Sequence, residues 1–502
     1  MPADATCAAS VAAVLCRDSE VSTVVIPEAS ESRPMRRLVI LRAALAGLFP
    51  VLAAPLSAQI ADRAALVAAL DSAARAHVAD ERVAGISVAV VRGTDTLLVR
   101  GYGSVDLEWD VPTPADASAS YEIGSVTKQF TAAAVMQLVE QGRLDLDADF
   151  TEYVTDFDTR GHTVPLRRLL DHTSGIKGYT EMEVFSDISL KDLPRDTLVS
   201  LVEAEPFEFE PGTAQIYNNS AYFLLGLIIE KVSGQPYAEY VQEHLFDAAG
   251  MASSYYCSER AVRAGRAHGY EAGEQGLQRQ GYLVHTWPYA AGSLCSTVRD
   301  LVRWNRALHG GGILSPDAYR EMITPQPLRD GTTLTYAMGL AVTERNGQPA
   351  ISHSGGIDGF LSDGRYYPAQ DLVTIVLQNT AGPRGPGALG DAFADLVFGP
   401  EPGPVSVPFA GDLDALVGEY AGPARGIHLH MTVTRDGEDL VFTRRGQTQG
   451  ARPVHVGDGV WQMGGARYSF DVAGGRSFEL MVAQGSGRYR LVKIPSNGGR
   501  WP

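Results

Sequence analysis

The chain has 502 residues, of which 45% are hydrophobic and 20% are charged. This composition is that of a globular protein, and the length allows two or three domains. The 59 acidic residues outnumber the 42 basic ones and give a formal net charge of −17 at pH 7. An acidic surface repels phosphate groups, so we expect neither a nucleic-acid partner nor binding to an anionic membrane.

The first predicted element is a targeting segment, MRRLVILRAALAGLFPVLAAPLSAQ. It has basic residues directly after Met35, an apolar stretch, and the small residue Ala58 at a plausible cleavage site, which is the order of a secretory signal peptide. Arg42 and Pro50 interrupt it and make it a poor membrane span. We therefore predict that residues 1–58 are an N-terminal extension and signal peptide, with translation starting at Met35. A cleaved signal peptide implies export of the protein to the periplasm or the medium. The alternative is that the segment is not cleaved and serves as a membrane anchor.

Residues 59–398 form the next predicted domain. An amphipathic helix at about Ile60 to Val78 precedes a hairpin in GISVAVVRGTDTLLVRGYG, and mostly helical segments follow from Leu144 to Gly310. LRRLLDHTSG, AYFLLGLIIEKVSG and TVRDLVRWNRALHGG each end in glycine, as helices often do. Strands return in TYAMGLAVTER, AISHSGG, GRYYP and LVTIVLQN. The predicted class is α/β (α+β): an antiparallel sheet flanked by helices, with a helical subdomain.

The C-terminal part has a different pattern. Residues 399–411 are rich in proline and glycine and are predicted to be a linker. Residues 412–502 contain short alternating segments such as IHLHMTVT, DLVFTRR and SFELMVA, separated by glycine-containing turns. They predict a small all-β barrel or sandwich domain.

The stretch SVTKQFTAAAVMQLV predicts a buried helix with one ionisable side chain, Lys128. Ser125 lies three residues earlier, so the two side chains lie one turn apart on the same face. Burial favours a neutral amine, and a neutral amine can activate a serine hydroxyl as a nucleophile. The chain has only five lysines, and arginine cannot act as a base. The same spacing recurs at Ser174 and Lys177 in a glycine-flanked loop, where we expect a turn serine and a solvated lysine.

Two further motifs carry candidate functional groups. Tyr217 and Asn219 precede an apolar helix, and in an extended segment both side chains point the same way; a core tyrosine and a helix N-cap are the structural alternative. His353 starts His-Ser-Gly-Gly at the end of an apolar strand, where the glycines permit close approach of a substrate backbone.

The three motifs, in this order, resemble the serine β-lactamase and penicillin-binding-protein family, in particular its class C-like branch with esterases and D-aminopeptidases. The resemblance covers about Ile60 to Phe398, and LLDHTSGI and GSLCSTVRDLVRW also look like that branch. It implies a β-lactamase/transpeptidase-like fold and no cofactor or metal. The C-terminal barrel is similar to accessory domains of some relatives.

The resemblance also implies roles for single residues. Ser125 would be the acylated nucleophile, Lys128 its activating amine and Tyr217 a proton carrier. The implied substrate-binding residues are Asn219, His353, Ser354, Gly355 and Gly356, with the backbone N–H of Gly356 and Ser125 facing the oxyanion. Relatives usually have lysine where this chain has His353, and a mostly neutral imidazole holds a carboxylate less well. We therefore expect ester or amide substrates rather than β-lactams.

Several alternatives stay open at this stage. The competing enzyme is a D-aminopeptidase or DD-peptidase acting on cell-wall-type peptides, and the competing non-enzyme is a penicillin-binding sensor or binding module without turnover. The chain has no G-x-S-x-G motif, which disfavours an α/β-hydrolase. His428 and His430 alternate on one strand without a third metal ligand nearby. Cys257 and Cys295 remain after signal cleavage, and either one disulfide or two free thiols fits the sequence.

Overall fold

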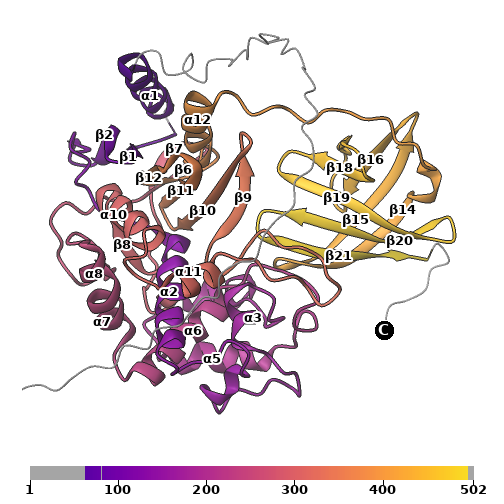
Figure 1. The fold of residues 1–502 in the computed structure, drawn as a ribbon, viewed down its shortest axis with the longest axis horizontal. Helices are drawn as coiled ribbons and strands as arrows, with labels where there is room; N and C mark the ends of the chain where they lie inside the picture. Colours follow the sequence, from indigo (N-terminus) through magenta and orange to yellow (C-terminus); the bar gives the residue numbers. More distant parts are fainter. Residues whose placement is uncertain (1–62, 81, 496–502) are drawn as a thin grey trace, which may run out of the picture. The chain divides into compact units, whose positions relative to one another are not determined.

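The computed structural model describes residues 63–80 and 82–495 (Figure 1). The predicted signal peptide, the start at Met35 and the cleavage near Ala58 lie outside the described residues and stay predictions. Within the part of the chain that the structure describes, no helix combines the length and apolar character needed to cross a bilayer.

A seven-stranded antiparallel sheet forms the centre of the first domain (Figure 1). Its strands, in spatial order, are β3 (Val111–Pro112), β2 (Asp95–Asp106), β1 (Gly85–Arg92), β12 (Leu372–Gln378), β11 (Phe360–Tyr367), β10 (Gln348–Ile357) and β9 (Ala341–Arg345). β1 and β2 are the predicted hairpin, and β1 pairs with β12 so that Val88 lies opposite Val376. The sheet is therefore assembled from both ends of the domain, as predicted.

Helices cover both faces of this sheet. On one face, α1 (Arg63–Val78) and α12 (Gly387–Phe398) pack over Val88 and Val90. On the other face, where Ala89 points, α10 (Val298–His309) packs on β1 and β12. This alternation is the period-2 pattern of a strand buried on both faces.

The predicted buried helix follows as the next layer. It begins as a 3₁₀ turn, Gly124–Val126, and continues as α2 (Thr127–Glu140). Phe130 stacks on Trp304 of α10 with ring centroids 4.0 Å apart. α6 (Asn219–Ser233) packs beside α2 and ends at Gly234, whose φ of 77° is the left-handed C-cap that the sequence predicted.

The remaining helices and short strands lie in the helical region and around it. They are α3 (Leu166–Leu170), α4 (Phe185–Ile188), α5 (Arg195–Ala204), α7 (Tyr237–Val241), α8 (Asp247–Ala249), α9 (Tyr289–Gly292), α11 (Pro316–Met322), and the strands β4 (Tyr121–Glu122), β5 (Tyr255–Tyr256), β6 (Tyr270–Gly273), β7 (Gly276–Arg279), β8 (Leu294–Ser296) and β13 (Thr380–Ala381).

Two predicted element boundaries were wrong. α3 ends at Leu170 rather than at the following glycine, because the Asp171 carboxylate accepts a bond from the Thr173 N–H at 3.1 Å and His172 adopts a φ of 64°. β9 begins only at Ala341, since Gly339 has a φ of 71° and ends the extended pattern before it.

The C-terminal domain is one curled antiparallel sheet. Its strands, in spatial order, are β16 (Asp439–Arg444), β15 (Ile427–Asp436), β14 (Gly418–Ala424), β21 (Gly487–Ile494), β20 (Arg476–Gln484), β19 (Ala466–Ala473), β18 (Val460–Met463) and β17 (Val454–His455). The all-β prediction is confirmed, but β16 and β17 form two edges, so the domain is a half-barrel and not a closed barrel. We call it the C-terminal half-barrel. It has its own core around Tyr420, Tyr468 and Trp461.

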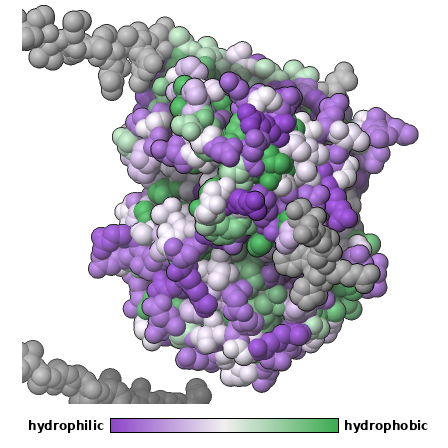
Figure 2. All heavy atoms as spheres, turned by 90° about the vertical axis from the view of Figure 1, so that its right-hand side faces the viewer, coloured by the Kyte–Doolittle hydropathy of each residue, from purple (hydrophilic) through white to green (hydrophobic). Residues whose placement is uncertain are grey.

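The C-terminal half-barrel and the seven-stranded sheet belong to one compact unit of the chain. Residues 399–411, between α12 and the half-barrel, contain no helix or strand. On the face shown in Figure 2, hydrophilic residues are spread over the whole surface with hydrophobic ones between them. This distribution is normal for a protein whose large apolar surfaces are enclosed in cores.

Candidate active site

Ser125 lies in the 3₁₀ turn that starts α2, and glycines hold this turn against β10. Gly124 has a φ of 52°, and a Cβ atom on it would lie 2.8 Å from the Gly356 carbonyl oxygen. A Cβ on Gly355 would lie 2.1 Å from the Ile123 carbonyl oxygen. Only glycine fits at either place. The first and third sequence motifs therefore meet backbone to backbone, although about 230 residues separate them in the chain.

Lys128 is completely buried beneath Ser125. Its Nζ atom lies 3.2 Å from Ser125 Oγ, 2.8 Å from Asn219 Oδ1 and 2.8 Å from the Ala291 carbonyl oxygen. Two of these three partners are oxygens that accept hydrogen bonds, and the third is a hydroxyl that can also donate one. A neutral amine has two hydrogens and one lone pair, and this set of partners satisfies all three.

The electrostatics favour this neutral form. Burial lowers the pKa of Lys128 well below its ordinary value, the positive charge of Arg425 lowers it further, and Glu181 opposes them. The amine can then accept the proton of Ser125, which lies one helical turn away as the spacing predicted.

Tyr217 and Asn219 reach Lys128 from the start of α6. The Lys128 Nζ atom lies 4.7 Å from the centroid of the Tyr217 ring. The Tyr217 hydroxyl is buried and has no hydrogen-bond partner among the described residues. Burial raises the pKa of the Tyr217 hydroxyl above its ordinary value, and the neighbouring Ser125 hydroxyl lowers this pKa by a smaller amount. The phenol is therefore neutral. A protonated phenol beside the serine can carry a proton.

The expected extended geometry of this motif was only partly right. The helix N-cap is Asn218, whose Oδ1 accepts a bond from the Ala221 N–H at 2.9 Å, and Asn219 is already the first helical residue. Asn219 still points to the lysine, because its Nδ2 donates to Thr180 Oγ1 at 3.1 Å and thereby fixes Oδ1 toward Nζ.

His353 lies in the cleft but both of its ring nitrogens are engaged. Nδ1 faces the Ser354 carbonyl oxygen at 2.5 Å and must donate to it. Nε2 then accepts the hydrogen bond from the Tyr336 hydroxyl at 2.9 Å. Burial lowers the pKa of His353 to about 3. The ring is therefore neutral, in line with the mostly neutral imidazole expected at this position, and its part in substrate binding stays a prediction.

The second Ser-x-x-Lys pair behaves differently from the first, and also from our expectation. Lys177 is not solvated: its side chain is 22% exposed and its Nζ binds Glu208 at 2.8 Å. Ser174 is buried, with its Oγ 3.4 Å from the Ile176 N–H. The ion pair with Glu208 explains why Lys177 is partly buried, which the loop pattern did not predict. The Nζ atom of Lys177 is thus paired with a carboxylate and not with a serine hydroxyl.

The motif residues line a cleft of about 980 Å³. Ser125, Tyr217, Asn219 and all four residues of the third motif are on its walls, together with residues of the C-terminal half-barrel. Ser354 and Gly356 are exposed there, whereas Gly355 is buried. Sequence reasoning missed His172, Tyr336, Ala291, Thr180, Glu181 and Arg425, which complete the surroundings of the lysine and tyrosine.

His172 supports the tyrosine. It is buried, its ring centroid lies 4.3 Å from that of Tyr217, and its Nδ1 accepts a bond from the Asn218 N–H at 3.2 Å. His172 lies in the segment LLDHTSGI, and the resemblance of this segment to the family was the sequence signal that pointed to the histidine.

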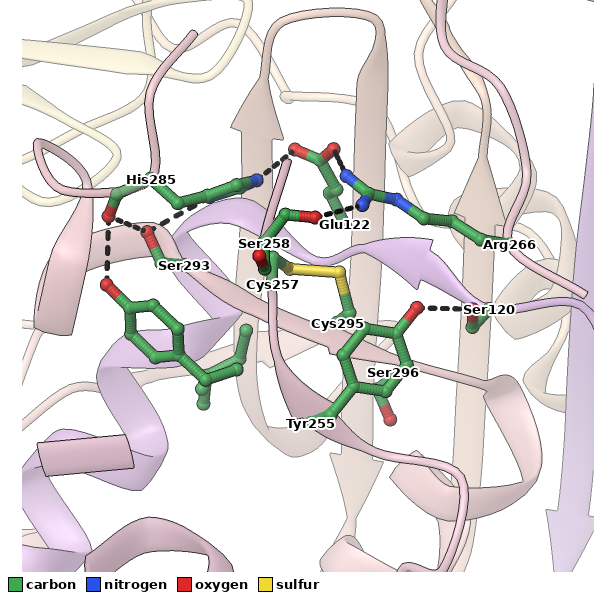
Figure 3. Close-up of a disulfide and its surroundings, with 12 residues drawn as sticks. Ser120, Glu122, Tyr255, Cys257, Ser258, Arg266, His285, Ser293, Cys295 and Ser296 are labelled. Carbon is green, nitrogen blue, oxygen red and sulfur yellow. Dashed lines mark hydrogen bonds and ion pairs between the residues drawn. A yellow bond between two sulfur atoms is a disulfide. The ribbon is translucent and has the colours of Figure 1, made fainter. Parts of the chain in front are cut away.

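Cys257 and Cys295 form a disulfide beside the segment that leads to Ser125 (Figure 3). This settles the open alternative in favour of one disulfide. β8, which contains Cys295, pairs with β4 and accepts the Ile123 N–H at the Leu294 carbonyl. The disulfide therefore anchors the strand that contacts the segment leading into the 3₁₀ turn with Ser125.

A buried ion cluster lies next to this disulfide. Glu122 lies between His285 and Arg266 (Figure 3), with Oε1 2.7 Å from Arg266 Nη2 and Oε2 3.4 Å from His285 Nε2. Burial raises the pKa of Glu122, but His285 and Arg266 outweigh this and leave it below its ordinary value. The cluster holds Glu122, which lies two residues before the 3₁₀ turn that contains Ser125.

The candidate metal ligands lie apart from this cleft. The His428 and His430 rings are 5.3 Å apart. Among the described residues, Asp106, Glu108 and His268 are the one group with ligand atoms close enough to share an ion, but Arg279 already pairs with Glu108 and His268 with Asp106. Exposed acidic groups of this kind are common without a metal.

Comparison with known proteins gives consistent matches. Residues 70–397 match the model of the Beta-lactamase family. The chain is 28% identical over 291 residues to the putative penicillin-binding protein PbpX of Bacillus subtilis (strain 168), covering 58% of this chain and 69% of that protein. It is 28% identical over 301 residues to a D-aminopeptidase of Brucella anthropi, covering 59% of this chain and 56% of that protein.

A solved structure extends the likeness further along the chain. The octameric penicillin-binding protein homologue from Pyrococcus abyssi matches with a TM-score of 0.58 and 26% identity, covering 85% of this chain and 100% of that one. The family match covers well over half of this chain. The protein therefore belongs to the beta-lactamase family, whose relatives here include penicillin-binding proteins and a D-aminopeptidase.

Proposed function

We propose that this protein is a serine hydrolase that forms an acyl-enzyme on Ser125 and transfers the acyl group to water. The observation that carries the proposal is the completely buried Lys128, whose Nζ lies 3.2 Å from Ser125 Oγ and has only oxygen acceptors as its other two partners. A structural lysine would be expected to pair with a carboxylate, as Lys177 does with Glu208.

The proposed chemistry uses the residues as follows. Lys128 accepts the proton of Ser125 while Oγ attacks the substrate carbonyl carbon, and the carbonyl oxygen gains the negative charge. The backbone N–H groups of Ser125 and Gly356 stabilise this charge. The Tyr217 phenol, beside both Lys128 and Ser125, relays the proton to the leaving group. Water then enters, loses a proton to the same groups and releases the acid.

Small esters and amides are the proposed substrates. A neutral, fully bonded His353 gives the third motif no cation for the carboxylate of a β-lactam. Amides of D-amino acids are the second candidate, which the D-aminopeptidase relative supports. The third candidate is a penicillin-binding sensor without turnover, which would form the acyl-enzyme but would not release the acid.

The experiment is a substrate panel measured by steady-state and burst kinetics. We expect repeated turnover of p-nitrophenyl esters or D-amino-acid p-nitroanilides that Ser125→Ala abolishes. A single burst without turnover would favour the sensor, and turnover retained in Ser125→Ala would refute the proposal. Ser174→Ala is the matched control, because it changes the serine of the other Ser-x-x-Lys pair.

We also propose that the protein is exported. The Cys257–Cys295 disulfide supports this, since disulfides persist in oxidising compartments. N-terminal sequencing of the mature protein tests it: a start after Ala58 is expected, and a protein that retains Met35 would contradict cleavage.

A further inference from the structure

One turn of the C-terminal half-barrel lies at the candidate active site. The turn is Arg425–Gly426, between β14 and β15, and Arg425 lines the same cleft as Ser125. The Arg425 guanidinium carbon lies 5.0 Å from the centroid of the Tyr217 ring. Its Nε donates to Glu181 Oε1 at 2.7 Å. A residue 300 positions after the serine thus contributes to its surroundings.

The fit of this turn depends on its glycine. Gly426 has a φ of 71°, and a Cβ atom on it would lie 2.8 Å from Glu181 Cγ. Any other residue would be strained in this conformation and would push the turn away from Glu181. The sequence Arg-Gly therefore both exposes the guanidinium and lets the backbone approach the cleft.

A second hairpin holds the half-barrel to the same region. The Gln215 N–H donates to the Arg488 carbonyl at 2.7 Å, and the Arg488 N–H donates to the Gln215 carbonyl at 2.8 Å. This two-way bridge lies two residues before Tyr217. Arg490 also pairs with Asp330. The half-barrel is thus attached beside the elements that carry Tyr217 and Glu181.

A continuous chain of hydrogen bonds connects the turn with the buried lysine. Lys128 binds Asn219 Oδ1 at 2.8 Å, and Asn219 donates to Thr180 Oγ1 at 3.1 Å. Thr180 in turn donates to Glu181 Oε2 at 2.9 Å, and the other oxygen of Glu181 holds Arg425. The position of the guanidinium is therefore fixed relative to Lys128.

Arg425 differs from the other cationic side chains of the cleft in its unused donors. Arg365 pairs with Asp363 and Asp391, and Arg345 with Asp391, Asp395 and Glu401. Arg425 has a hydrogen bond to Glu181 through Nε alone, and among the described residues its Nη groups have no hydrogen-bond partner. Its side chain is about half exposed, at 51%. The two NH₂ groups of a rigid guanidinium, with four N–H donors, are thus available beside Tyr217.

We propose that Arg425, supplied by the C-terminal half-barrel, binds the carboxylate of the substrate and makes the enzyme select acyl compounds that carry one. Planar guanidinium groups bind carboxylates through paired N–H donors. The substrate class is then short peptides or acyl-amino-acid esters and amides with a free carboxylate. This inference rests on the proposed acyl transfer at Ser125 and adds the group that selects the substrate.

The test compares two substrates that differ in one group. A chromogenic ester or amide with a free carboxylate and its carboxamide analogue are assayed with wild type, Arg425→Gln and Arg425→Lys. We expect Arg425→Gln to lower kcat/KM for the carboxylate substrate about 10- to 100-fold, mainly through KM, which is the effect of losing a charged hydrogen-bond partner. The carboxamide analogue should change less than about threefold. Comparing the pair cancels any effect of the lost charge on Lys128.

The controls separate this inference from the proposed function. Arg435→Gln changes another ion-paired arginine of the half-barrel, on β15, and should leave the substrate ratio unchanged. If wild type and Arg425→Gln both react at Ser125 with a fluorophosphonate probe but have the same substrate ratio, the carboxylate anchor is refuted and acyl transfer stands. A parallel loss for both substrates also refutes it, because a purely structural role gives that result. No reaction of wild type with the probe would refute the proposed function itself.

Discussion

Replacing Lys128 with methionine removes the proposed base and keeps the shape of the side chain. The residue is completely buried, and its amine binds Ala291 O and Asn219 Oδ1. Each lost hydrogen bond lowers the free energy of unfolding by about 1 kcal/mol, and removing the buried amine, which no longer has to be desolvated, offsets part of this loss. We therefore expect a folded protein whose free energy of unfolding changes by less than about 2 kcal/mol.

The activity should respond much more strongly than the stability. Proton transfer by a positioned base contributes about 10²- to 10⁴-fold, so a loss of about three decades in kcat/KM corresponds to about 4 kcal/mol of transition-state stabilisation. The assay is ester or amide turnover, with urea unfolding of the same preparation. Turnover within tenfold of wild type would refute the role of Lys128 as base.

Lys128→Arg is the less useful variant, for a reason that the structure supplies. The amine is buried and, within the described part of the chain, has no carboxylate partner, so a permanent charge there should destabilise the fold by several kcal/mol. A melting temperature equal to that of wild type would contradict the neutral amine.

Other predictions test the neighbouring groups. Tyr217→Phe should lower kcat about 10- to 100-fold, with little change in melting temperature because the hydroxyl has no partner among the described residues; equal turnover would contradict proton relay. Since the pKa of Lys128 is lowered, kcat/KM should rise with pH through a pKa well below the ordinary lysine value and be high at neutral pH; a profile that rises only near pH 10 would contradict the neutral base. Replacing Cys257 and Cys295 by serine opens a loop with a sequence separation of 38 and should cost about 4 kcal/mol of unfolding free energy. Chemical denaturation of this variant against wild type measures the loss, and an unchanged midpoint would show that the bond contributes nothing.

The sequence was informative wherever the relevant residues are close together in the chain or follow a simple period. The Ser125–Lys128 spacing predicted a contact that the structure has, and alternation in β1 predicted the hairpin. The sequence could not reveal Ala291 or Arg425, because backbone carbonyls leave no signal in a motif and a loop arginine looks like any surface charge. The burial of Lys177 was missed because its partner Glu208 is 31 residues away in the chain.

The ring of His353 illustrates a different limit. Its residue type predicted a mostly neutral imidazole, but only its contacts with Ser354 O and Tyr336 show which neutral tautomer it adopts. Tyr336 lies 17 residues earlier in a segment that was predicted to be strand but is irregular. Tautomer and charge follow from such contacts and not from the motif.

Intact-mass spectrometry after exposure to a fluorophosphonate probe tests the central claim most directly. Wild type should gain the mass of one adduct, mapped by peptide analysis to Ser125. Ser125→Ala should gain none, and Lys128→Met should react far more slowly. An absence of adduct on folded wild-type protein, or an adduct that persists in Ser125→Ala, would contradict a serine nucleophile activated by the buried lysine.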